Sequence, residues 1–330
     1  MRLVFVTQRV DVDDPALGAT VAKIRALAAR VDELVVLALS ARPTELPANV
    51  RVRTFGGGTR AGRTLRLVTA IARERPTAVL AHMAPIYAVL AAVVTKPRRV
   101  PLLLWFTHWR ASRLLGLAER LATRVVTVDE RSFPLRSDKI VAVGHGIEIG
   151  EAVPPRADDG VLRLLALGRT SPAKGLETMI AAVATLDGVE LEIRGPSLTD
   201  EEQRHRAHLI ALGAHVEEPV PRTLIGEVYA AVDALVNNMR VGALDKVVYE
   251  AGAAGLPVLV ASEGFGPLVD GIEPPLRFVQ DDVPSLAERI RGLVDAGSAG
   301  RAAAGAELRR RVARDHSVEH WADAIVAAAQ

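Results

Sequence analysis

The chain has 330 residues, 49% of them hydrophobic and 24% charged, and its 41 Lys and Arg nearly balance its 39 Asp and Glu. This length is too great for one ordinary core and fits two α/β domains, while the composition excludes a disordered chain and a surface that wraps nucleic acid. The absence of cysteine excludes disulfides, thiolate metal sites and cysteine nucleophiles, so we expect a cytoplasmic protein.

In the first half of the chain, short β-branched runs alternate with helical patterns. The pattern predicts helices over residues 19–29 and 62–74, and strands at residues 2–7, 33–39, 50–55, 77–82, 100–107 and 124–130. Strands separated by helices of this length are typical of βαβ units and a parallel sheet. We interpret the first run, "RLVFVT", as a buried strand rather than part of a signal peptide.

The alternation breaks at residues 149–160, "IGEAVPPRADDG", whose prolines, glycines and acidic residues indicate an interdomain linker. We therefore predict a first domain over residues 1–149 and a second over residues 150–316. A last helix over residues 317–330 can pack back on the first domain.

The second half repeats the alternation, with strands predicted at residues 162–167, 189–195, 233–238, 257–262 and 276–280. The predicted fold class is therefore α/β, with two doubly wound, Rossmann-like parallel-sheet domains that face a cleft. In such folds the ligand site lies where the carboxyl ends of the strands open into loops.

Two loops in this pattern are candidates for phosphate binding. The first, "GGTRAGRT" at residues 57–64, matches the P-loop pattern except that Arg63 replaces the lysine. An arginine is not equivalent to that lysine, and the next strand lacks an aspartate that could help to hold magnesium. We interpret this loop as a surface turn.

The second loop, "GRTSPAKG" at residues 168–175, has a better composition for an anion site. Gly168 lets the backbone turn closely, Ser171 can cap a helix that begins at Pro172, and Arg169 and Lys174 flank the N-terminus of that helix. Free N–H groups and the helix dipole favour an anion there, and the two cations suit a diphosphate. The alternative is a solvated helix start with two surface cations.

Downstream, "LDKVVYEAGAAGLP" predicts a helix over residues 246–254, with Asp245 as its cap and Gly255 as its end. Glu250 lies in the middle of this helix. A carboxylate there can accept two hydrogen bonds from a ribose diol, as acidic residues do in other nucleotide sites. Taken alone, Glu250 reads as a solvated helix residue, but with Arg169 and Lys174 it completes a nucleotide-diphosphate site.

Together, these motifs resemble a known family. "GRTSPAKGLETMIAA" and "LDKVVYEAGAAGLPVLVAS" resemble the donor-binding half of the GT-B retaining glycosyltransferases of family 4, also called group 1 glycosyl transferases. "TQRVDVDDPALGAT", "LLLWFTHW" and "IVAVGHGIE" resemble further segments of the same family, so the resemblance covers most of the chain.

The resemblance implies transfer of a sugar, with retention and without a metal, from a nucleotide diphosphate to an acceptor hydroxyl. The expected donor is a UDP- or GDP-sugar, the acceptor is a sugar, a lipid or a small molecule, and no cofactor or nucleic acid is involved. Arg169 and Lys174 would hold the leaving diphosphate, His108 would reach the donor sugar, and Glu250 would bind the ribose. The other expected donor-side residues are Gly168, Arg194, Gly195, Val220, Gly242, Ala243, Leu244, Asp245 and Lys246.

On the acceptor side, the resemblance places Gly18 and Ala19 in the loop after the first strand, beside His108. His82 and His145 also lie near strand ends, but a lone histidine is more often structural, so they rank below His108. The helix pattern "RASRLLGLAERLATR" sets arginines opposite leucines, which fits either peripheral contact with anionic lipid or a sheet-covering helix, and we favour the latter.

One departure from the family pattern affects the expected sugar site. The family often carries two glutamates separated by seven residues, and Gly242 stands where the first would lie before Glu250. Sugar recognition would then fall to the backbone amides of residues 241–244 or to Asp245. A nucleotide-sugar 2-epimerase and a non-catalytic nucleotide-sugar-binding protein therefore stay open as alternatives.

Overall fold

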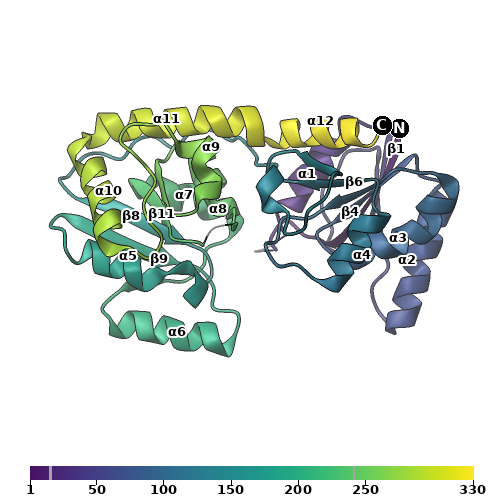
Figure 1. The fold of residues 1–330 in the computed structure, drawn as a ribbon, viewed down its shortest axis with the longest axis horizontal. Helices are drawn as coiled ribbons and strands as arrows, with labels where there is room; N and C mark the ends of the chain where they lie inside the picture. Colours follow the sequence, from purple (N-terminus) through teal and green to yellow (C-terminus); the bar gives the residue numbers. More distant parts are fainter. Residues whose placement is uncertain (15–16, 241) are drawn as a thin grey trace. The chain divides into compact units, whose positions relative to one another are not determined.

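The computed structural model describes residues 1–14, 17–240 and 242–330 and divides the chain into two compact units. Unit 1 comprises Met1–Gly146 with Asp315–Gln330, and unit 2 comprises Ile147–Arg314. Each unit is built on one parallel sheet, of seven strands in unit 1 and five in unit 2 (Figure 1). The predicted pair of doubly wound α/β domains is confirmed.

The sheet of unit 1 has the order β3-β2-β1-β4-β5-β6-β7. Its strands are β1 (Arg2–Val10), β2 (Glu33–Ala41), β3 (Val50–Thr54), β4 (Ala78–His82), β5 (Leu102–Trp105), β6 (Arg124–Thr127) and β7 (Ile140–Ala142). The order reverses direction between β1 and β4, so the loops after these two strands flank the topological switch point of the unit. The sequence pattern predicts six of these strands and misses β7, because three residues are too few to show an alternation.

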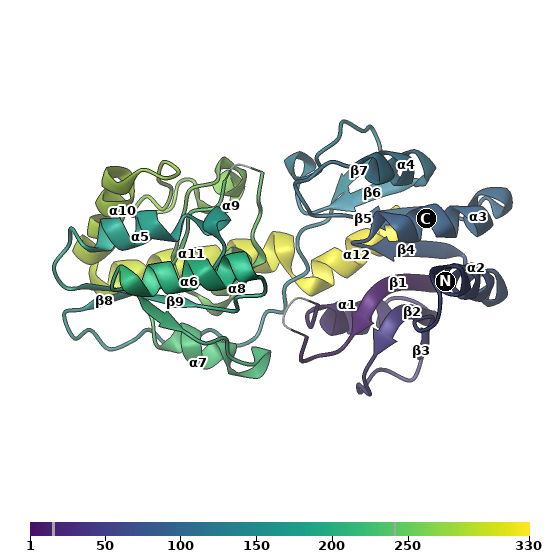
Figure 2. The same cartoon turned by 90° about the horizontal axis from the view of Figure 1, so that it is seen from below.

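Helices cover both faces of this sheet. The helices of unit 1 are α1 (Thr20–Ala28), α2 (Arg60–Glu74), α3 (Pro85–Arg98), α4 (Arg113–Leu121) and α12 (Val318–Ala328), with a 3-10 turn η1 (Glu130–Ser132). α1 and α12 lie together on one face, and α2, α3 and α4 lie side by side on the other (Figures 1 and 2). Thr59 caps α2 by accepting a hydrogen bond from the Gly62 N–H at 3.1 Å, so "GGTRAGRT" forms a turn and a helix start.

An aromatic and cationic cluster fixes α12 to unit 1. Trp321 is fully buried and meets the Trp105 ring edge-on at 5.6 Å, while the Lys23 ammonium lies 4.5 Å and 5.0 Å from the Trp105 and Trp321 ring centroids. A Cβ atom at Gly146 would approach Lys23 Cε to 2.6 Å, and Gly146 has φ +73°, so only glycine fits there. Cation–π attraction and aromatic burial together hold this C-terminal helix in place.

The sheet of unit 2 has the order β10-β9-β8-β11-β12. Its strands are β8 (Leu162–Leu167), β9 (Val189–Arg194), β10 (His215–Glu217), β11 (Ala234–Asn237) and β12 (Val258–Val260). Its helices are α5 (Leu176–Val183), α6 (Asp200–Ala211), α7 (Ile225–Ala230), α8 (Lys246–Ala254), α9 (Gly266–Val269), α10 (Val283–Asp295) and α11 (Gly297–His316), the last two residues of which belong to unit 1. Three 3-10 turns, η2 (Pro172–Lys174), η3 (Arg222–Leu224) and η4 (Glu263–Phe265), complete it. The switch point here lies between β8 and β11.

Two local predictions in unit 2 were wrong. The segment 276–280, expected as a strand, pairs with β12 through a single bridge between Arg277 and Val260, since the chain turns away at Asp281, which has φ +56°. The helix expected to begin at Pro172 is interrupted: Ser171 caps only the 3-10 turn η2, and α5 begins at Leu176 after Gly175 in the left-handed region. A left-handed residue breaks the run of helical dihedrals, and glycine adopts that conformation without strain.

Among the described residues, none of the helices combines the length and apolar character that crossing a lipid bilayer would require.

We expect Trp321→Ala to lower the free energy of unfolding of unit 1 by about 4 kcal/mol, because it leaves a large cavity beside Trp105 and removes a cation–π partner of Lys23. Urea unfolding followed by circular dichroism measures this loss. The matched control is Trp109→Ala, since Trp109 is 38% exposed, and it should change stability by less than about 0.5 kcal/mol. Equal losses in the two variants would contradict the anchoring role of α12.

Candidate functional site

The loops after β8 and β11 form the candidate site of unit 2. These neighbouring parallel strands pair in register, with Leu164 opposite Ala234 and Leu165 opposite Leu235, so both end at the same edge of the sheet. The loop after β8 carries Gly168 to Lys174, and the chain after β11 leads to Asp245. This edge is the switch point of the sheet, where open α/β folds bind their ligands.

Lys174 and Asp245 meet at this edge. The Lys174 ammonium forms an ion pair with the Asp245 carboxylate and donates a second hydrogen bond to the Leu167 carbonyl at 3.2 Å. Both side chains are largely buried, with 13% and 20% of their surface exposed. A Cβ atom at Gly168, which has φ +127°, would lie 2.6 Å from Lys174 Nζ, so the glycine makes room for the ammonium.

The Asp245 carboxylate is held ionised by its neighbours. Burial by itself raises the pKa of this carboxyl, but the positive charge and hydrogen bond of Lys174, with the Asn237 amide at 3.0 Å, outweigh burial and hold the pKa below its ordinary value. The helix expected over residues 246–254 is confirmed as α8, with Gly255 at its end. The side chain of Asp245, expected to cap it, is instead directed to Lys174 and Asn237.

At the same edge of the sheet, the backbone after β9 approaches the backbone after β8 closely. A Cβ atom at Gly195, which has φ +149°, would lie 2.1 Å from the Gly168 carbonyl oxygen. On the other side, Asn238 donates to the Gly175 carbonyl at 3.1 Å and to Asp281 at 2.8 Å. These contacts fix both ends of the loop that carries Lys174.

The structure gives Arg169 a different partner from Lys174. Its Nη1 donates to Glu202 Oε1 on α6 at 3.0 Å, and the other oxygen of that buried carboxylate accepts the Leu198 N–H at 2.7 Å. The Arg169 side chain is 56% exposed. Arg169 and Lys174, the two predicted diphosphate-binding cations, are therefore each paired with a different carboxylate. Among the described residues, no ion pair or hydrogen bond links one of these pairs to the other.

Glu250 forms a second ionic cluster, on α8. Its Oε1 meets both Arg222 Nη1 and Lys246 Nζ at 2.9 Å, and Arg222 also contacts Glu148 at 3.3 Å. Among the described residues no donor reaches Oε2, so that oxygen is open to accept a ligand hydroxyl. Beside it lies a cavity of about 120 Å³, lined in part by Glu148, Arg222, Tyr229 and Glu250.

Tyr229 closes this cavity with a buried hydroxyl. No hydrogen-bond partner for its oxygen is found in the part of the chain that the structure describes. Burial, reinforced by the negative charge of Glu250, raises the pKa of this phenol well above its ordinary value, so it is a neutral donor at any physiological pH.

The remaining predicted donor-side residues do not join these clusters. Arg194 donates to Glu192 at 2.5 Å and to the Glu218 carbonyl at 3.0 Å. Val220 lies half-buried in the loop before η3. Gly242, Ala243 and Leu244 lie in the loop before α8, where Gly242 has φ +86° and open space at its Cβ position. Residue 241 lies outside the described residues.

In unit 1, the predicted acceptor-side residues Gly18, Ala19 and His82 lie at the switch point between β1 and β4. A Cβ atom at Gly18 would lie 2.6 Å from the Val12 carbonyl oxygen, so the loop after β1 folds tightly onto it, and Ala19 precedes α1. His82 is buried with its Nδ1 at 3.2 Å from the Thr7 hydroxyl. Burial, and then the charge of Lys23, hold the pKa of His82 well below its ordinary value.

The other two histidines lie at other strand ends. His108 follows β5, is exposed, accepts the Arg110 N–H at 3.0 Å and stacks on Trp109. His145 follows β7 and is buried. Of the three histidines, only His82 therefore lies at the switch point between β1 and β4, whereas His108 and His145 follow other strands.

Five residues that contribute to the two sites were missed in the sequence: Asn237, Asn238, Glu202, Arg222 and Tyr229. Polar side chains at the end of a buried strand, as in "DALVNN", were the available signal for the two asparagines. The other three are brought to the site by the topology: Glu202 is 33 residues from Arg169 in the chain, Arg222 is 28 residues from Glu250, and Tyr229 lies on a different helix from Glu250. Local periodicity carries no such information.

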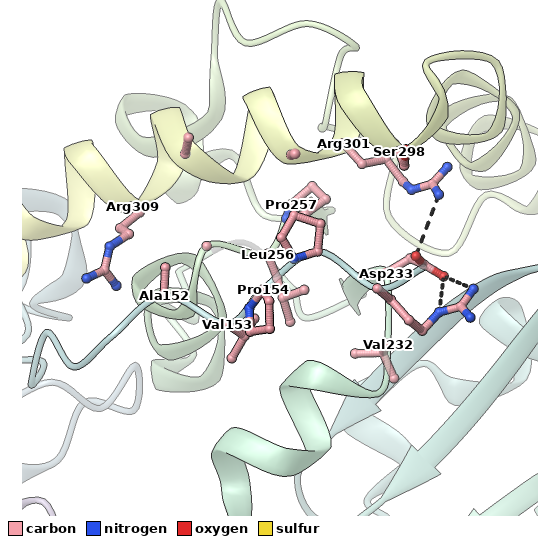
Figure 3. A pocket seen from close by; sticks show the side chains of 15 residues that line it. Ala152, Val153, Pro154, Val232, Asp233, Leu256, Pro257, Ser298, Arg301 and Arg309 are labelled. Carbon is pink, nitrogen blue, oxygen red and sulfur yellow. Dashed lines mark hydrogen bonds and ion pairs between the residues drawn. The ribbon is translucent and has the colours of Figure 1, made fainter. Parts of the chain in front are cut away.

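A larger cavity, of about 220 Å³, lies elsewhere in unit 2 (Figure 3). It is lined by the linker segment 152–156, by Leu256 and Pro257 before β12, and by one side of α11. Its buried Asp233 is paired with Arg156 at 3.2 Å and with Arg301 at 3.6 Å, so the charges at its wall compensate one another. None of the predicted site residues lines this cavity.

Within residues 1–14, 17–240 and 242–330, no three or more His, Cys, Asp or Glu side chains gather in an arrangement suited to a metal ion.

Comparison with known proteins links unit 2 to one family. Residues 162–296 match the model of glycosyl transferases group 1. The matched segment contains Gly168, Lys174, Asp245 and Glu250. No curated protein matches the sequence significantly.

Solved structures match nearly the whole chain. HepE of Anabaena, in complex with UDP and glucose, is similar with a TM-score of 0.77 at 17% identity, covering 99% of this chain and 98% of that chain. Sucrose-phosphate synthase of Thermosynechococcus elongatus is similar with a TM-score of 0.77 at 16% identity, covering 99% and 98%. A glycosyltransferase of Rickettsia africae gives 0.77 at 13% identity, covering 99% and 97%. The fold is therefore GT-B, as predicted.

A double-mutant cycle of Lys174→Met and Asp245→Asn tests whether the two charges depend on each other. We expect the double variant to lose about 2 kcal/mol less unfolding free energy than the sum of the losses of the two single variants. Each single variant leaves one poorly solvated charge without its partner. Urea unfolding measures the four proteins. The control cycle uses the pair Arg206–Glu218, whose carboxylate is 80% exposed, with an expected coupling below about 1 kcal/mol. Equal coupling energies in the two cycles would contradict this interpretation.

We expect acid to destabilise unit 1 through His82. Because its pKa is lowered in the folded state, the unfolded chain takes up a proton near pH 6.5 that the folded chain does not, so stability is full above that pH and falls as the pH is lowered. Between pH 7 and pH 5, His82→Gln should lose about 2 kcal/mol less unfolding free energy than the unsubstituted protein. Parallel losses in the two proteins would show that His82 is not the group responsible.

Proposed function

We propose that this protein transfers a sugar from a nucleotide-diphosphate sugar to an acceptor hydroxyl, with the donor bound at the switch point of unit 2. The observation that carries the proposal is the Lys174 ammonium, positioned by Asp245 over Gly168, within the segment that matches glycosyl transferases group 1. HepE, which shares the fold at 18% identity, has been crystallised with UDP-glucose. We expect a UDP- or GDP-sugar as the donor here.

The chemistry required of the donor site is stabilisation of a diphosphate whose negative charge grows as the bond to the sugar breaks. An ammonium has three N–H donors, and Leu167 and Asp245 occupy two of those on Lys174, which leaves one for a phosphate oxygen. Arg169 has five N–H donors and uses one on Glu202. The carboxylates hold both cations in place before the substrate arrives, so little ordering is required when it binds.

Glu250 fits the role of ribose acceptor in this proposal. Arg222 and Lys246 hold its Oε1 and keep the side chain in one position, while Oε2 faces no protein donor among the described residues. A ribose hydroxyl can donate to that oxygen. Retention of configuration, metal independence and an acceptor site at the switch point of unit 1 belong to the proposal through the family resemblance.

A second candidate, a non-catalytic nucleotide-sugar-binding protein, is favoured by Gly242. The backbone there has φ +86°, a conformation that an L-residue side chain adopts only with strain, so this loop is shaped for glycine rather than for the family glutamate. Donor binding measured by calorimetry, together with no sugar transfer to any acceptor and no epimerised product, would favour this candidate over a transferase or an epimerase.

Thermal shift with UDP-, GDP-, ADP- and dTDP-sugars identifies the donor, because a ligand that binds only the folded state raises the melting temperature. We expect one nucleotide class to stabilise the protein and Lys174→Met to abolish that shift. The combined variant Lys174→Met with Asp245→Asn should recover stability but not donor binding, which separates loss of fold from loss of site.

With the identified donor, Lys174→Met should lower kcat/KM at least about a hundredfold, the loss expected when one group that stabilises the transition state is removed. Arg206→Ala, a cation of the same unit outside the site, is the matched control and should keep the activity of the unsubstituted protein. Normal turnover by Lys174→Met would contradict the proposed role of this loop.

A further inference from the structure

Charge is divided unevenly along the chain. Residues 60–124 contain twelve Lys or Arg and two Glu, a formal charge of +10, whereas the rest of the chain has 29 cations and 37 anions, a formal charge of −8. These sum to the +2 of the whole sequence, so the small net charge hides a strongly basic segment. That segment contains α2, α3 and α4 of unit 1.

The twelve cations of this segment form no ion pairs within the described residues, although ion pairs are frequent in the rest of the chain. Its two acids are occupied by cations from outside the segment. Glu74 pairs with Arg51 at 3.0 Å and Arg53 at 2.9 Å, and Glu119 lies 3.6 Å from Lys139. The positive charge of the segment is therefore not compensated by the protein itself.

The helices α2, α3 and α4 carry eight of the twelve cations and form one continuous surface. Of the other four, Arg75 and Arg99 follow the ends of α2 and α3, Arg110 lies in the loop before α4, and Arg124 begins β6. The three helices lie side by side on the sheet face opposite α1 and α12, α3 in contact with both α2 and α4 (Figure 2). Eleven of the twelve cations are exposed and Arg63 is half-buried. Because the inner faces of these helices form the core with the sheet, the charge can face only outward.

The same surface also exposes large apolar side chains. In the described part of unit 1, seven large hydrophobic residues are exposed; five of them lie on α2, α3 or α4, a sixth, Trp109, lies in the loop that leads into α4, and Val12 lies elsewhere. The first six are Leu65, Ile86, Val93, Trp109, Leu114 and Leu117, with exposed fractions between 38% and 65%. Exposed apolar groups interleaved with uncompensated cations are a combination that water does not favour and that a lipid headgroup region does.

Helix α4 by itself carries both exposed apolar side chains and cations. Leu115 and Ala118 point inward and are fully buried, as a sheet-covering helix requires. Leu114 and Leu117 are exposed on the opposite side, with Arg113 and Arg120 flanking them. One helix thus covers the sheet with one face and presents an amphipathic face to its surroundings.

We infer that the outer surface of α2, α3 and α4 docks on an anionic lipid bilayer. The cations would lie among acidic headgroups and the aliphatic side chains would enter the boundary with the acyl chains. A nucleic acid is disfavoured, because single strands are held by stacking on aromatic side chains, and this surface exposes five aliphatic residues but only one aromatic, Trp109. This inference goes beyond the transfer reaction and does not depend on it.

Vesicle co-sedimentation of the full chain tests the inference. We expect binding to vesicles with about 30 mol% phosphatidylglycerol in phosphatidylcholine, at least tenfold weaker binding to pure phosphatidylcholine, and a loss of binding as salt is raised. The charge-reversal variant Lys96→Glu/Arg113→Glu/Arg120→Glu should bind the anionic vesicles at least tenfold more weakly. Its matched control, Arg25→Glu/Arg204→Glu/Arg291→Glu, makes the same change in net charge at exposed sites away from this surface and should bind as the unsubstituted protein does.

A second pair of variants tests the apolar part of the surface. Leu114→Ser/Leu117→Ser should weaken binding several-fold, while Leu198→Ser/Leu212→Ser, which alters exposed leucines of unit 2, should not. Tryptophan emission gives an independent readout, because Trp105 and Trp321 are buried and Trp109 is exposed. Anionic lipids with brominated acyl chains should quench the emission of the bound protein, and Trp109→Phe should remove that quenching.

Three results would overturn the inference. The first is equal affinity for anionic and neutral vesicles at low salt. The second is equal loss of binding in the two charge-reversal variants, which would mean that net charge rather than this surface decides. The third is binding to heparin or to single-stranded DNA that matches the affinity for vesicles and ignores Leu114→Ser/Leu117→Ser, which would point to a polyanion instead of a bilayer. Melting temperatures of all variants show that each is folded.

Discussion

The ion pair of Lys174 and Asp245 is the contact on which the arrangement of the unit 2 site depends. Two adjacent parallel strands end side by side, and this pair joins the loop after one to the helix after the other. The ammonium fits only because Gly168 has no side chain, and Gly168 is itself fixed by its approach to Gly195. The interrupted helix start at Gly175 follows from the same requirement, because the short turn η2 delivers Lys174 to the sheet edge and α5 then begins anew.

The cations of the Lys174 site and of the neighbouring Glu250 cluster are each paired with a carboxylate. Lys174 has Asp245, Arg169 has Glu202, and Arg222 shares Glu250 with Lys246. Such pairing weakens the positive field that an incoming anion meets. It also removes the entropy cost of ordering long side chains at the moment of binding, and it sets their geometry for the charge that develops later in a reaction. A site of this kind selects among anionic ligands by their geometry more than by their net charge.

Periodicity predicted most of the sheet and the loop of Lys174 because glycine, proline and buried strands have local signatures. It could not predict that Asp245 is directed to Lys174 rather than to the helix behind it, since a good capping residue and a good ion-pair partner are the same residue type. The short strands β7 and β10 carry too few residues for a pattern. Arg222 and Glu250 are 28 positions apart in the chain, so their contact follows from where the turn η3 and the helix α8 lie in the fold and not from any motif.

The net charge of the whole chain hides this surface for a related reason. The sum over the chain is +2, although residues 60–124 carry a net charge of +10 and the rest of the chain a net charge of −8. Elsewhere arginines find carboxylates across strands and turns, as Arg51 does with Glu74, and local charge largely cancels. The segment 60–124 cannot cancel its charge in that way, because it has only two acids and both serve neighbouring elements. Counting charge over each βα segment of the sequence would have located this surface, since a parallel-sheet fold assigns consecutive crossover helices on one side of the switch point to the same face.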